Sequence, residues 1–519
     1  MIHHCTLLLV LFPLAGVCAG ELFDETQVRT LFSFDTVSIP HTQNLRLEMR
    51  QPERHPANPV LQRGAPGTPD AHGVQFYGSV IREGGRYRMW YVAFDDEANN
   101  KMASARWRPA YAESLDGVHW TKPDLGLVTF KGNKHNNLIL TDPAPLGLVN
   151  LKVLRDPDDP DPKRRYKATG HAYFRHNTRL GSLAPFVSAD GLSWTMTKPA
   201  KTKAAELVKA DLVLPAVHFE PSGGLYKWEG LFYAIGQNSM NAPQPYHGRV
   251  TRMYRSSDFV NWSQTSTIGF VRAQQHTLLG PGRSREGEQT HEGISVWNRG
   301  NVLIGVSGLW HGAKEWRDVT IDLGFMISND GLNFREAAHE WTFIKRGEDG
   351  AWDQGGLLQG QGFENIGDQT FIYYGAWDPR HWEEVPTRGG VGIAVLPRDR
   401  FGDLVIEEVG KGPGDYQQPE ITSEFITAAI PVRSGSSPRF YVNADGLGDR
   451  AFLRIELLDA LEKPLPGYSA EVRQSGFQTP VNWASARDGN GLPESVKLRV
   501  VFEGVSKTSI RLSAIYVQP

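Results

Sequence analysis

A seven-residue motif, Ser-x-Asp-Gly/Phe-x-x-aromatic, recurs about every 70 residues and restricts the possible folds more than any other feature. Its four copies carry the aspartates Asp116, Asp190, Asp258 and Asp330, and a degenerate fifth copy contains Asp399. An aspartate in this position can accept hydrogen bonds from backbone N–H groups two or three residues ahead, while the glycine tolerates positive φ. We therefore expect the first four aspartates to hold tight turns and to do no chemistry.

Each copy follows a run of strand-forming residues, and each unit also contains a strand rich in aromatic side chains. A four-stranded unit cannot bury both of its faces alone, so units repeated in this way must pack in a ring. The sequence predicts an all-β fold with a five-bladed β-propeller over residues 70–410. It further predicts a linker over residues 411–424 and a β-sandwich over residues 425–519. Residues 20–69 are expected to lead into the ring and to supply a strand that closes it.

The first 19 residues combine an apolar run with small residues before a cleavage site, which is typical of a signal peptide. We expect a secreted or periplasmic protein, although a lipoprotein anchored through Cys18 is an alternative. Both cysteines, Cys5 and Cys18, would be lost with this segment, which excludes a disulfide framework or a thiol nucleophile in the mature chain. The formal net charge of −3 and the absence of later long apolar runs argue against nucleic-acid and membrane partners.

Acidic residues occur near the expected start of the innermost strand in most blades. In a propeller these strands converge on a central funnel, where crowded carboxylates repel one another and are kept only if chemistry needs them. Cleavage of a glycosidic bond needs two carboxyl groups with different pKa values, so the predicted substrate is an oligosaccharide or polysaccharide. The candidate acids are Asp70, Asp156, Glu220 and Glu292; the candidate substrate-binding residues are Gln75, Arg155, His291, Trp90, Trp310 and Trp377.

Two short motifs resemble the five-bladed glycoside hydrolase families 32 and 43. Arg155-Asp156-Pro157 is similar to the Arg-Asp-Pro motif of family 32, and Glu220-Pro221 stands where both families carry a general acid. The resemblance implies that Asp156 stabilises the transition state and that Glu220 is the acid/base. The chain departs from family 32 in the first blade, where residues 75–79 contain no acid in place of the nucleophile. Either Asp70 takes that role from a longer loop, or the pair has moved around the ring and includes Glu292.

These residues favour a secreted glycoside hydrolase, with a non-catalytic carbohydrate-binding propeller as the alternative. A sialidase-like propeller is a third interpretation, but its turn motif has one more residue between the aspartate and the tryptophan. No pattern requires a cofactor or a metal ion, although an acidic funnel could hold Ca²⁺.

Overall fold

The computed structural model describes most of the chain between residues 28 and 519. The described ranges are 28–95, 107–142, 144, 147–173, 181–198, 213–214, 218–238, 249–272, 286–378, 389–407, 421–433, 438–484 and 492–519. The expected signal peptide and most of the expected linker lie outside them. Apart from three short 3-10 helices, the regular secondary structure of the described part consists of β-strands, which confirms the all-β prediction. It contains no helix that is long and apolar enough to cross a membrane.

Among the described residues, five mainly antiparallel units follow one another along the chain, each built around an innermost strand. The first contains β5 (Gly73–Glu83), β6 (Arg86–Phe94), β7 (Trp107–Ser114) and β8 (Trp120–Thr121). The second contains β11 (Lys152–Arg155), β10 (Gly147–Leu148), β12 (Tyr166–Tyr173), β13 (Ser182–Ser188), β14 (Ser193–Met196) and β9 (Leu140–Asp142), with the short 3-10 helix η2 (Pro162–Arg164). The third contains β15 (Glu220–Trp228), β16 (Leu231–Asn238), β17 (Val250–Ser256) and β18 (Thr267–Phe270).

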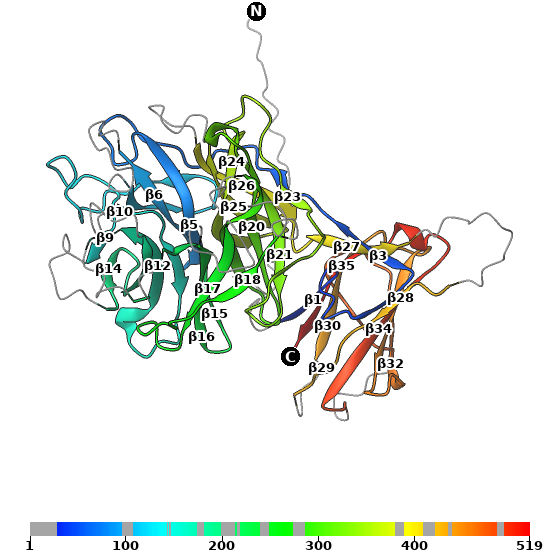
Figure 1. Cartoon of the computed structure of the whole chain (residues 1–519). Coiled ribbons are helices and arrows are strands. Elements are labelled where there is room, and N and C mark those ends of the chain that lie inside the picture. The colour runs from blue at the N-terminus through cyan, green and yellow to red at the C-terminus, as the bar shows by residue number, and fades with distance from the viewer. Residues whose placement is uncertain are drawn as a thin grey trace, which may run out of the picture.

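The last two units complete the series. The fourth contains β19 (Gly287–Asn298), β20 (Leu303–Gly312), β21 (Thr320–Ser328), β22 (Arg335–Glu336) and β23 (Thr342–Ile344), with η5 (Trp316–Asp318) between β20 and β21. The fifth contains β24 (Gly356–Ile366), β25 (Gln369–Trp377), β26 (Gly389–Pro397) and β4 (Glu53–Arg54). The innermost strands contact one another in the order β5, β11, β15, β19, β24 and back to β5, so the units form the blades of a β-propeller. These units make up the larger lobe of the molecule in Figure 1.

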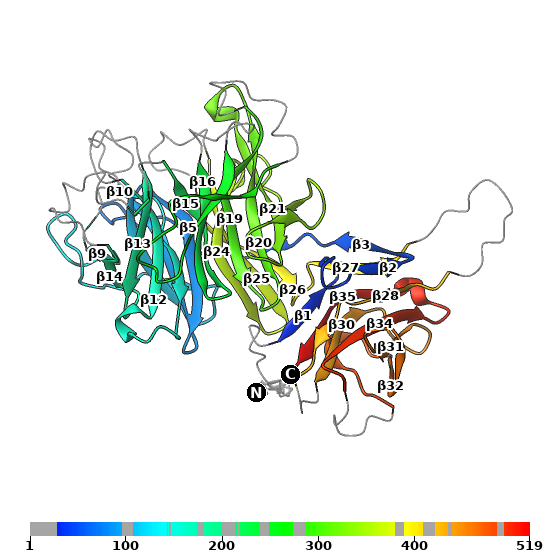
Figure 2. The ribbon, with the colours of Figure 1, turned by 60° about the horizontal axis from the view of Figure 1, so that its bottom comes forward.

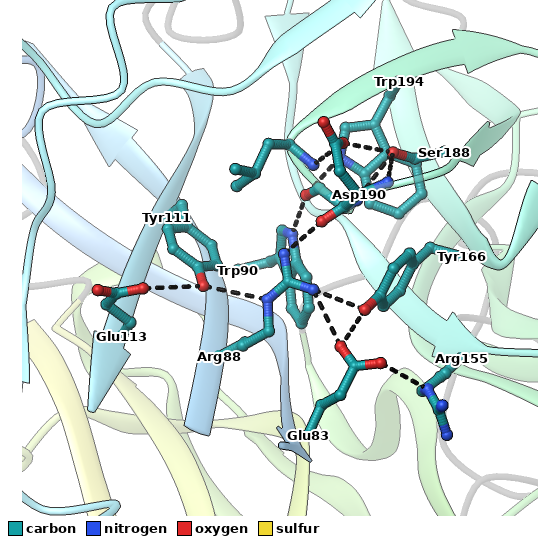
Figure 3. Close-up of polar contacts among 12 residues, drawn as sticks. Glu83, Arg88, Trp90, Tyr111, Glu113, Arg155, Tyr166, Ser188, Asp190 and Trp194 are labelled. Atoms are coloured by element: carbon teal, nitrogen blue, oxygen red, sulfur yellow. Dashed lines mark hydrogen bonds and ion pairs between the residues drawn. The ribbon is translucent and has the colours of Figure 1, made fainter. Parts of the chain in front are cut away.

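The motif turns hold neighbouring blades together. In the second blade the Asp190 carboxylate accepts hydrogen bonds from the backbone N–H groups of Leu192 and Ser193 at 2.8 and 2.9 Å, as the sequence predicts. The carbonyl of Gly191 in the same turn accepts a 2.7 Å hydrogen bond from Nε1 of Trp90 in the first blade (Figure 3). Each turn thus uses its own aspartate for its shape and its backbone for the contact with the preceding blade.

The same relation recurs around the whole ring. In the other turns the accepting carbonyl group belongs to Gly117, Asp258 or Gly331. The donors in the preceding blades are, in the same order, Tyr373, Arg164 and Tyr226. The first of these contacts joins blade 1 to blade 5 and therefore closes the circle. In the degenerate fifth turn, the Asp399 carboxylate itself reaches Arg299 of blade 4.

The carboxylate of Asp190 is expected to stabilise its turn. Burial raises the pKa of Asp190, but the N–H groups of Ser193 and Leu192 outweigh it and hold this pKa below its usual value. Asp190→Ala should therefore lower the free energy of unfolding by about 1–2 kcal/mol at neutral pH. A depressed folded-state pKa stabilises above the unfolded pKa and loses this effect as the pH falls, so the deficit should shrink in acid. Urea unfolding at pH 7 and pH 3 measures it, and an equal deficit at both values would contradict this account.

The remaining strands form a β-sandwich beside the propeller. One sheet contains β3 (Leu45–Met49), β27 (Gly402–Ile406), β35 (Arg511–Gln518), β30 (Arg439–Asp445), β33 (Gly476–Pro480) and β1 (Arg29–Phe32). The other contains β2 (His41–Gln43), β28 (Glu424–Ile426), β34 (Ser495–Glu503), β31 (Phe452–Leu458), β32 (Pro464–Val472) and β29 (Ile430–Pro431). The 3-10 helix η7 (Lys507–Ser509) precedes β35.

The sandwich draws strands from both ends of the chain, which differs from the predicted division at residues 70, 410 and 425. Strands β1, β2 and β3 precede the propeller and β27 falls within its predicted range, yet all four pair in the sandwich (Figure 2). Of the predicted lead-in, β4 and the bridge from Leu61 to Val391 pair with β26 and complete blade 5. The reason is hydrophobic burial: Phe32 and Phe34 fill a core shared with blades 4 and 5, so the leading segment is needed where the two domains meet.

Candidate active site at the hub

Four of the five innermost strands contain a β-bulge near the hub. The register shifts lie after Gln75 in β5, Glu220 in β15, His291 in β19 and Gln359 in β24. A bulge bends the strand and redirects a side chain, and bulges are enriched next to active sites. In β19 the bulge places the non-glycine residue Glu292 at a φ of 56°, a backbone strain that functional sites often carry.

Glu220 and Glu292 come together at this hub. Nε2 of Gln237, on β16, donates hydrogen bonds to Oε2 of Glu220 and to Oε1 of Glu292, the latter at 3.0 Å. Oε1 of Gln237 accepts the backbone N–H of Glu292 at 2.9 Å, which fixes the orientation of the amide. Because both carboxyl groups accept from one nitrogen, their nearest oxygens lie within about 6 Å of each other.

Glu220 is held as a carboxylate. Nδ1 of His218 accepts the backbone N–H of Gly181 at 3.2 Å, so a neutral His218 carries its proton on Nε2, which lies 3.1 Å from Oε1 of Glu220. Burial opposes the charge on Glu220. The hydrogen bond from His218, the positive charges that His171 and His218 carry when protonated, and the hydrogen bond from Gln237 together outweigh it. The pKa of Glu220 therefore lies below its usual value.

Glu292 is held as a carboxylic acid. Burial is the largest cause and the negative charge of Glu220 the next, and together they raise the pKa of Glu292 well above its usual value. Lys152 lies fully buried at the hub and partly offsets this effect, donating a 2.8 Å hydrogen bond to the carbonyl oxygen of Gln359. Two neighbouring carboxyl groups with opposite pKa shifts can supply a charged base or nucleophile and a proton donor at the same pH.

Other side chains at the hub were not predicted from sequence. The hydroxyl group of Tyr77 lies 3.4 Å from Nδ1 of His291, and burial followed by the charges of Glu292 and Glu220 raises its pKa. The buried guanidinium of Arg249 lies 3.8 Å from the centre of the Trp310 ring. Burial lowers the pKa of Arg249 below its usual value, and the opposing effect of the two glutamates is smaller. Tyr77 lies two residues after the predicted Gln75 and could have been found from that position, whereas Arg249 and Lys152 follow no recognisable motif.

One group of side chains could hold a metal ion. The ligand atoms of His171, His218 and Glu220 all lie within 4.8 Å of one another. Burial lowers the pKa of His171 to about 4, so its imidazole is neutral and able to act as a ligand near pH 7. Two imidazole nitrogens with one carboxylate suit a transition metal better than Ca²⁺, which prefers oxygen ligands.

The structure places Asp156 away from this pair. β11 ends at Arg155, so Asp156 follows the innermost strand of its blade instead of preceding it. Its carboxylate binds Lys167 at 2.7 Å and Lys227 at 2.9 Å. Lys227 is seven residues beyond Glu220 on the same strand, which corresponds to roughly 20 Å. Asp156 therefore borders a surface hollow of about 450 Å³ at the other end of the ring.

Two further predicted polar residues also lie in structural contacts. Asp70 is buried and accepts a 2.9 Å hydrogen bond from the hydroxyl group of Tyr91, and it forms an ion pair with Lys122. Arg155 pairs with Glu83 of blade 1 at 2.8 Å, in the contact between blades 1 and 2 (Figure 3). Neither contact brings these side chains to Glu220 and Glu292.

The remaining predicted binding residues differ in their exposure. Trp90 and Trp310 have no exposed surface, so neither can present its face to a sugar in this structure, because blade packing covers both rings. Trp377 is partly exposed. His291 is buried next to Glu292 and stacks on Trp310, while Gln75 lies at the bulge of β5 with a buried Oε1 atom.

Several solved structures resemble this chain at low sequence identity. No protein-family model matches the sequence, and no curated protein matches it. A structure described as a GH130 family glycoside hydrolase that targets β-1,2 mannosidic linkages in Candida mannan is 16% identical, with a TM-score of 0.43, over 67% of this chain and 94% of that chain. A glycosyl hydrolase from Bacteroides ovatus is 15% identical, with a TM-score of 0.45, over 69% and 98%.

A third solved structure is an N-acetylgalactosamine deacetylase from F. plautii in complex with blood group B trisaccharide. It is 16% identical, with a TM-score of 0.42, over 69% of this chain and 96% of that chain.

Proposed function

We propose that this chain is an exported glycoside hydrolase that cleaves its substrate with retention of configuration. One observation carries the proposal: Glu220 and Glu292 share the amide of Gln237 at the hub, and their pKa values are shifted in opposite directions. Retaining enzymes hold their two carboxyl groups roughly 5–5.5 Å apart, and inverting enzymes roughly 6.5–9.5 Å apart. The shared amide favours the shorter separation.

In this proposal Glu220 is the nucleophile and Glu292 the acid/base. The Glu220 carboxylate attacks the anomeric carbon while the Glu292 proton passes to the leaving oxygen, which breaks the glycosidic bond and forms a glycosyl ester. Glu292, now a carboxylate, removes a proton from a water molecule that attacks the ester and releases Glu220. The assignment reverses the role that the family resemblance implies for Glu220, because its hydrogen bonds stabilise the charged form.

The test is hydrolysis of a panel of oligosaccharides by the mature chain, followed by NMR of the first product formed. We expect cleavage of at least one linkage, with the product released in the anomeric configuration of the substrate. Initial release of the opposite anomer would exclude Glu220 as a nucleophile. Binding without turnover on every member would favour the non-catalytic carbohydrate-binding alternative.

The pH dependence follows from the two carboxyl groups. Activity should fall in acid as Glu220 becomes protonated, at a pH below the usual range of a glutamate. It should fall on the alkaline side as Glu292 loses its proton, well above that range. A plot of kcat/KM against pH checks both limbs, and Glu292→Gln should remove the alkaline limb alone. A profile that keeps this limb in the variant would assign it to another group.

A second candidate, a metal-dependent hydrolase acting on carbohydrate, is favoured by the histidine cluster. His171 and His218 would hold the ion with Glu220, and the ion would supply Lewis-acid chemistry. Activity that survives exhaustive chelation supports the carboxylate pair. Activity lost to a chelator and restored by Zn²⁺ or Mn²⁺ supports the metal instead.

A further inference from the structure

A line of aromatic rings leads from the acid pair to the rim of the propeller. The ring of His291, next to Glu292, stacks on Trp310 with 5.1 Å between centroids. Trp310 contacts Trp316 at 5.7 Å, and Trp316 contacts Trp377 at 5.5 Å. The line therefore begins beside the proposed proton donor and crosses from blade 4 to blade 5.

The register of the strands places this line at the funnel end of the ring. Trp310 pairs with Gln289, three residues before Glu292 near the start of β19. Trp377 pairs with Gly356, the first residue of β24. Both tryptophans thus lie where the innermost strands begin, which is the end at which Glu220 also stands on β15.

The two outer rings are partly exposed, whereas Trp310 is fully buried. Trp316 stands in η5, between the exposed residues Glu315 and Arg317. Trp310, Val319 and Ile321 form a small apolar cluster, against which both outer tryptophans pack. Keeping two large aromatic side chains partly in water costs free energy, and such surfaces commonly mark binding sites.

A charged network connects the strands next to the two outer tryptophans. Nδ1 of His311, the residue after Trp310, lies 2.8 Å from Glu288, and its Nε2 lies 3.1 Å from Asp322. Burial lowers the pKa of His311, but the hydrogen bonds to Asp322 and Glu288 outweigh it and raise this pKa to about 9. The imidazole is therefore charged at neutral pH and ties β19, β20 and β21 together, which favours a preorganised surface.

We propose that Trp316 and Trp377 form a subsite for a second sugar unit, so that the substrate is a carbohydrate chain extending beyond the scissile bond. This inference rests on the proposed function of the Glu220–Glu292 pair. An indole ring is rigid, with an apolar face and an N–H group at its edge. A sugar ring with apolar C–H groups on one face and hydroxyl groups around its edge matches this surface. The two tryptophans select the length of the substrate chain, while the Glu220–Glu292 pair performs the chemistry.

The experiment compares two substrates of the same sugar. The first is an oligosaccharide of two to six units, drawn from manno-, cello-, galacto-, xylo- and fructo-oligosaccharides. The second is the corresponding monosaccharide glycosyl fluoride, whose leaving group is a single atom and reaches no second subsite. Trp316→Ala and Trp377→Ala should each lower kcat/KM roughly tenfold to hundredfold on the oligosaccharide, as expected for the loss of one buried aromatic contact. The same variants should change kcat/KM on the fluoride less than twofold.

Three variants or measurements serve as controls. Trp316→Phe keeps an aromatic face and should recover most of the activity on the oligosaccharide. Trp341→Ala removes a partly buried tryptophan that packs on Phe343 elsewhere in blade 4, and it should not separate the two substrates. Thermal melting of each variant shows whether it is folded. Equal losses on both substrates, or no loss on either, would overturn the subsite.

Calorimetry keeps this test separate from the proposed function. The same oligosaccharides are titrated into the Glu292→Gln protein, with and without Trp316→Ala. Weaker binding in the double variant supports the subsite even if no substrate is cleaved. Unchanged binding overturns it even if the hydrolase proposal holds.

Discussion

Glu292→Gln is expected to lower kcat/KM about 10²–10⁴-fold on glycosides with poor leaving groups, the range typical for loss of a general acid. The substitution keeps the hydrogen bond that Glu292 receives from Gln237, because the amide oxygen can accept it at the same place. It removes the acidic proton, and with it the protonation of the leaving oxygen. The loss should therefore depend on how much help the leaving group needs.

Two substrates make that dependence measurable. A glycosyl fluoride or a nitrophenyl glycoside leaves without strong protonation, so the first step should be nearly normal for these compounds, and a glycosyl-enzyme ester should accumulate on Glu220. Mass spectrometry of the stopped reaction detects the added sugar. Equal losses on activated and unactivated substrates would argue that Glu292 is not the proton donor.

Glu220→Gln provides the companion measurement. Removing the nucleophile should abolish turnover on both classes of substrate, roughly 10⁴-fold or more. Glu315→Gln changes an exposed carboxylate near the rim and should leave activity intact. Asp156→Asn discriminates between the two sites: full activity supports the Glu220–Glu292 pair, and loss of activity in a folded variant would return the chemistry to the Arg-Asp-Pro motif.

The two glutamates could be predicted from sequence because each lies on a long innermost strand, Glu220 as the first residue of β15 and Glu292 as the sixth of the twelve residues of β19. Asp156 could not be placed in the same way, because β11 begins several residues earlier than the sequence pattern predicts. The residue of β11 at the hub is Lys152, four residues before Asp156, and burial holds the pKa of this lysine well below its usual value. A shift of a few residues moves a side chain from the funnel to the opposite end of a short strand, and hydrophobic alternation alone does not fix that shift.

The turn motif predicted the repeat well because its chemistry is local: each of the first four aspartates bonds backbone groups within three residues. The sandwich was harder, since strands such as β1 are paired with residues hundreds of positions away, and no local pattern records such pairing. Trp316 was missed for a related reason. It stands in a 3-10 helix of three residues, too short to show any periodicity.

The degenerate fifth motif suggests the largest effect on stability. Arg299 is buried in blade 4, and its guanidinium binds both oxygens of Asp399 at 2.5 and 3.0 Å. Asp399 also accepts a 2.9 Å hydrogen bond from the hydroxyl group of Tyr516 in the sandwich. Arg299 further packs over Phe32 of β1, so the pair connects blades 4 and 5 with the sandwich.

Arg299→Met is expected to lower the free energy of unfolding by about 3–5 kcal/mol, because it leaves the Asp399 carboxylate buried without its cation. Burial raises the pKa of Asp399 and Arg299 more than offsets this, so that the pKa lies below its usual value. Without Arg299 the burial effect dominates and the folded-state pKa rises, so protonation should relieve part of the cost as the pH falls. The difference between wild type and variant in urea unfolding should therefore be smaller at pH 4.5 than at pH 7.5. Arg86→Met, which breaks an exposed pair with Glu113, should cost no more than about 1 kcal/mol at either pH. A small and pH-independent loss for Arg299→Met would mean that the apolar contacts with Phe32 and its neighbours, and not the ion pair, hold the two domains together.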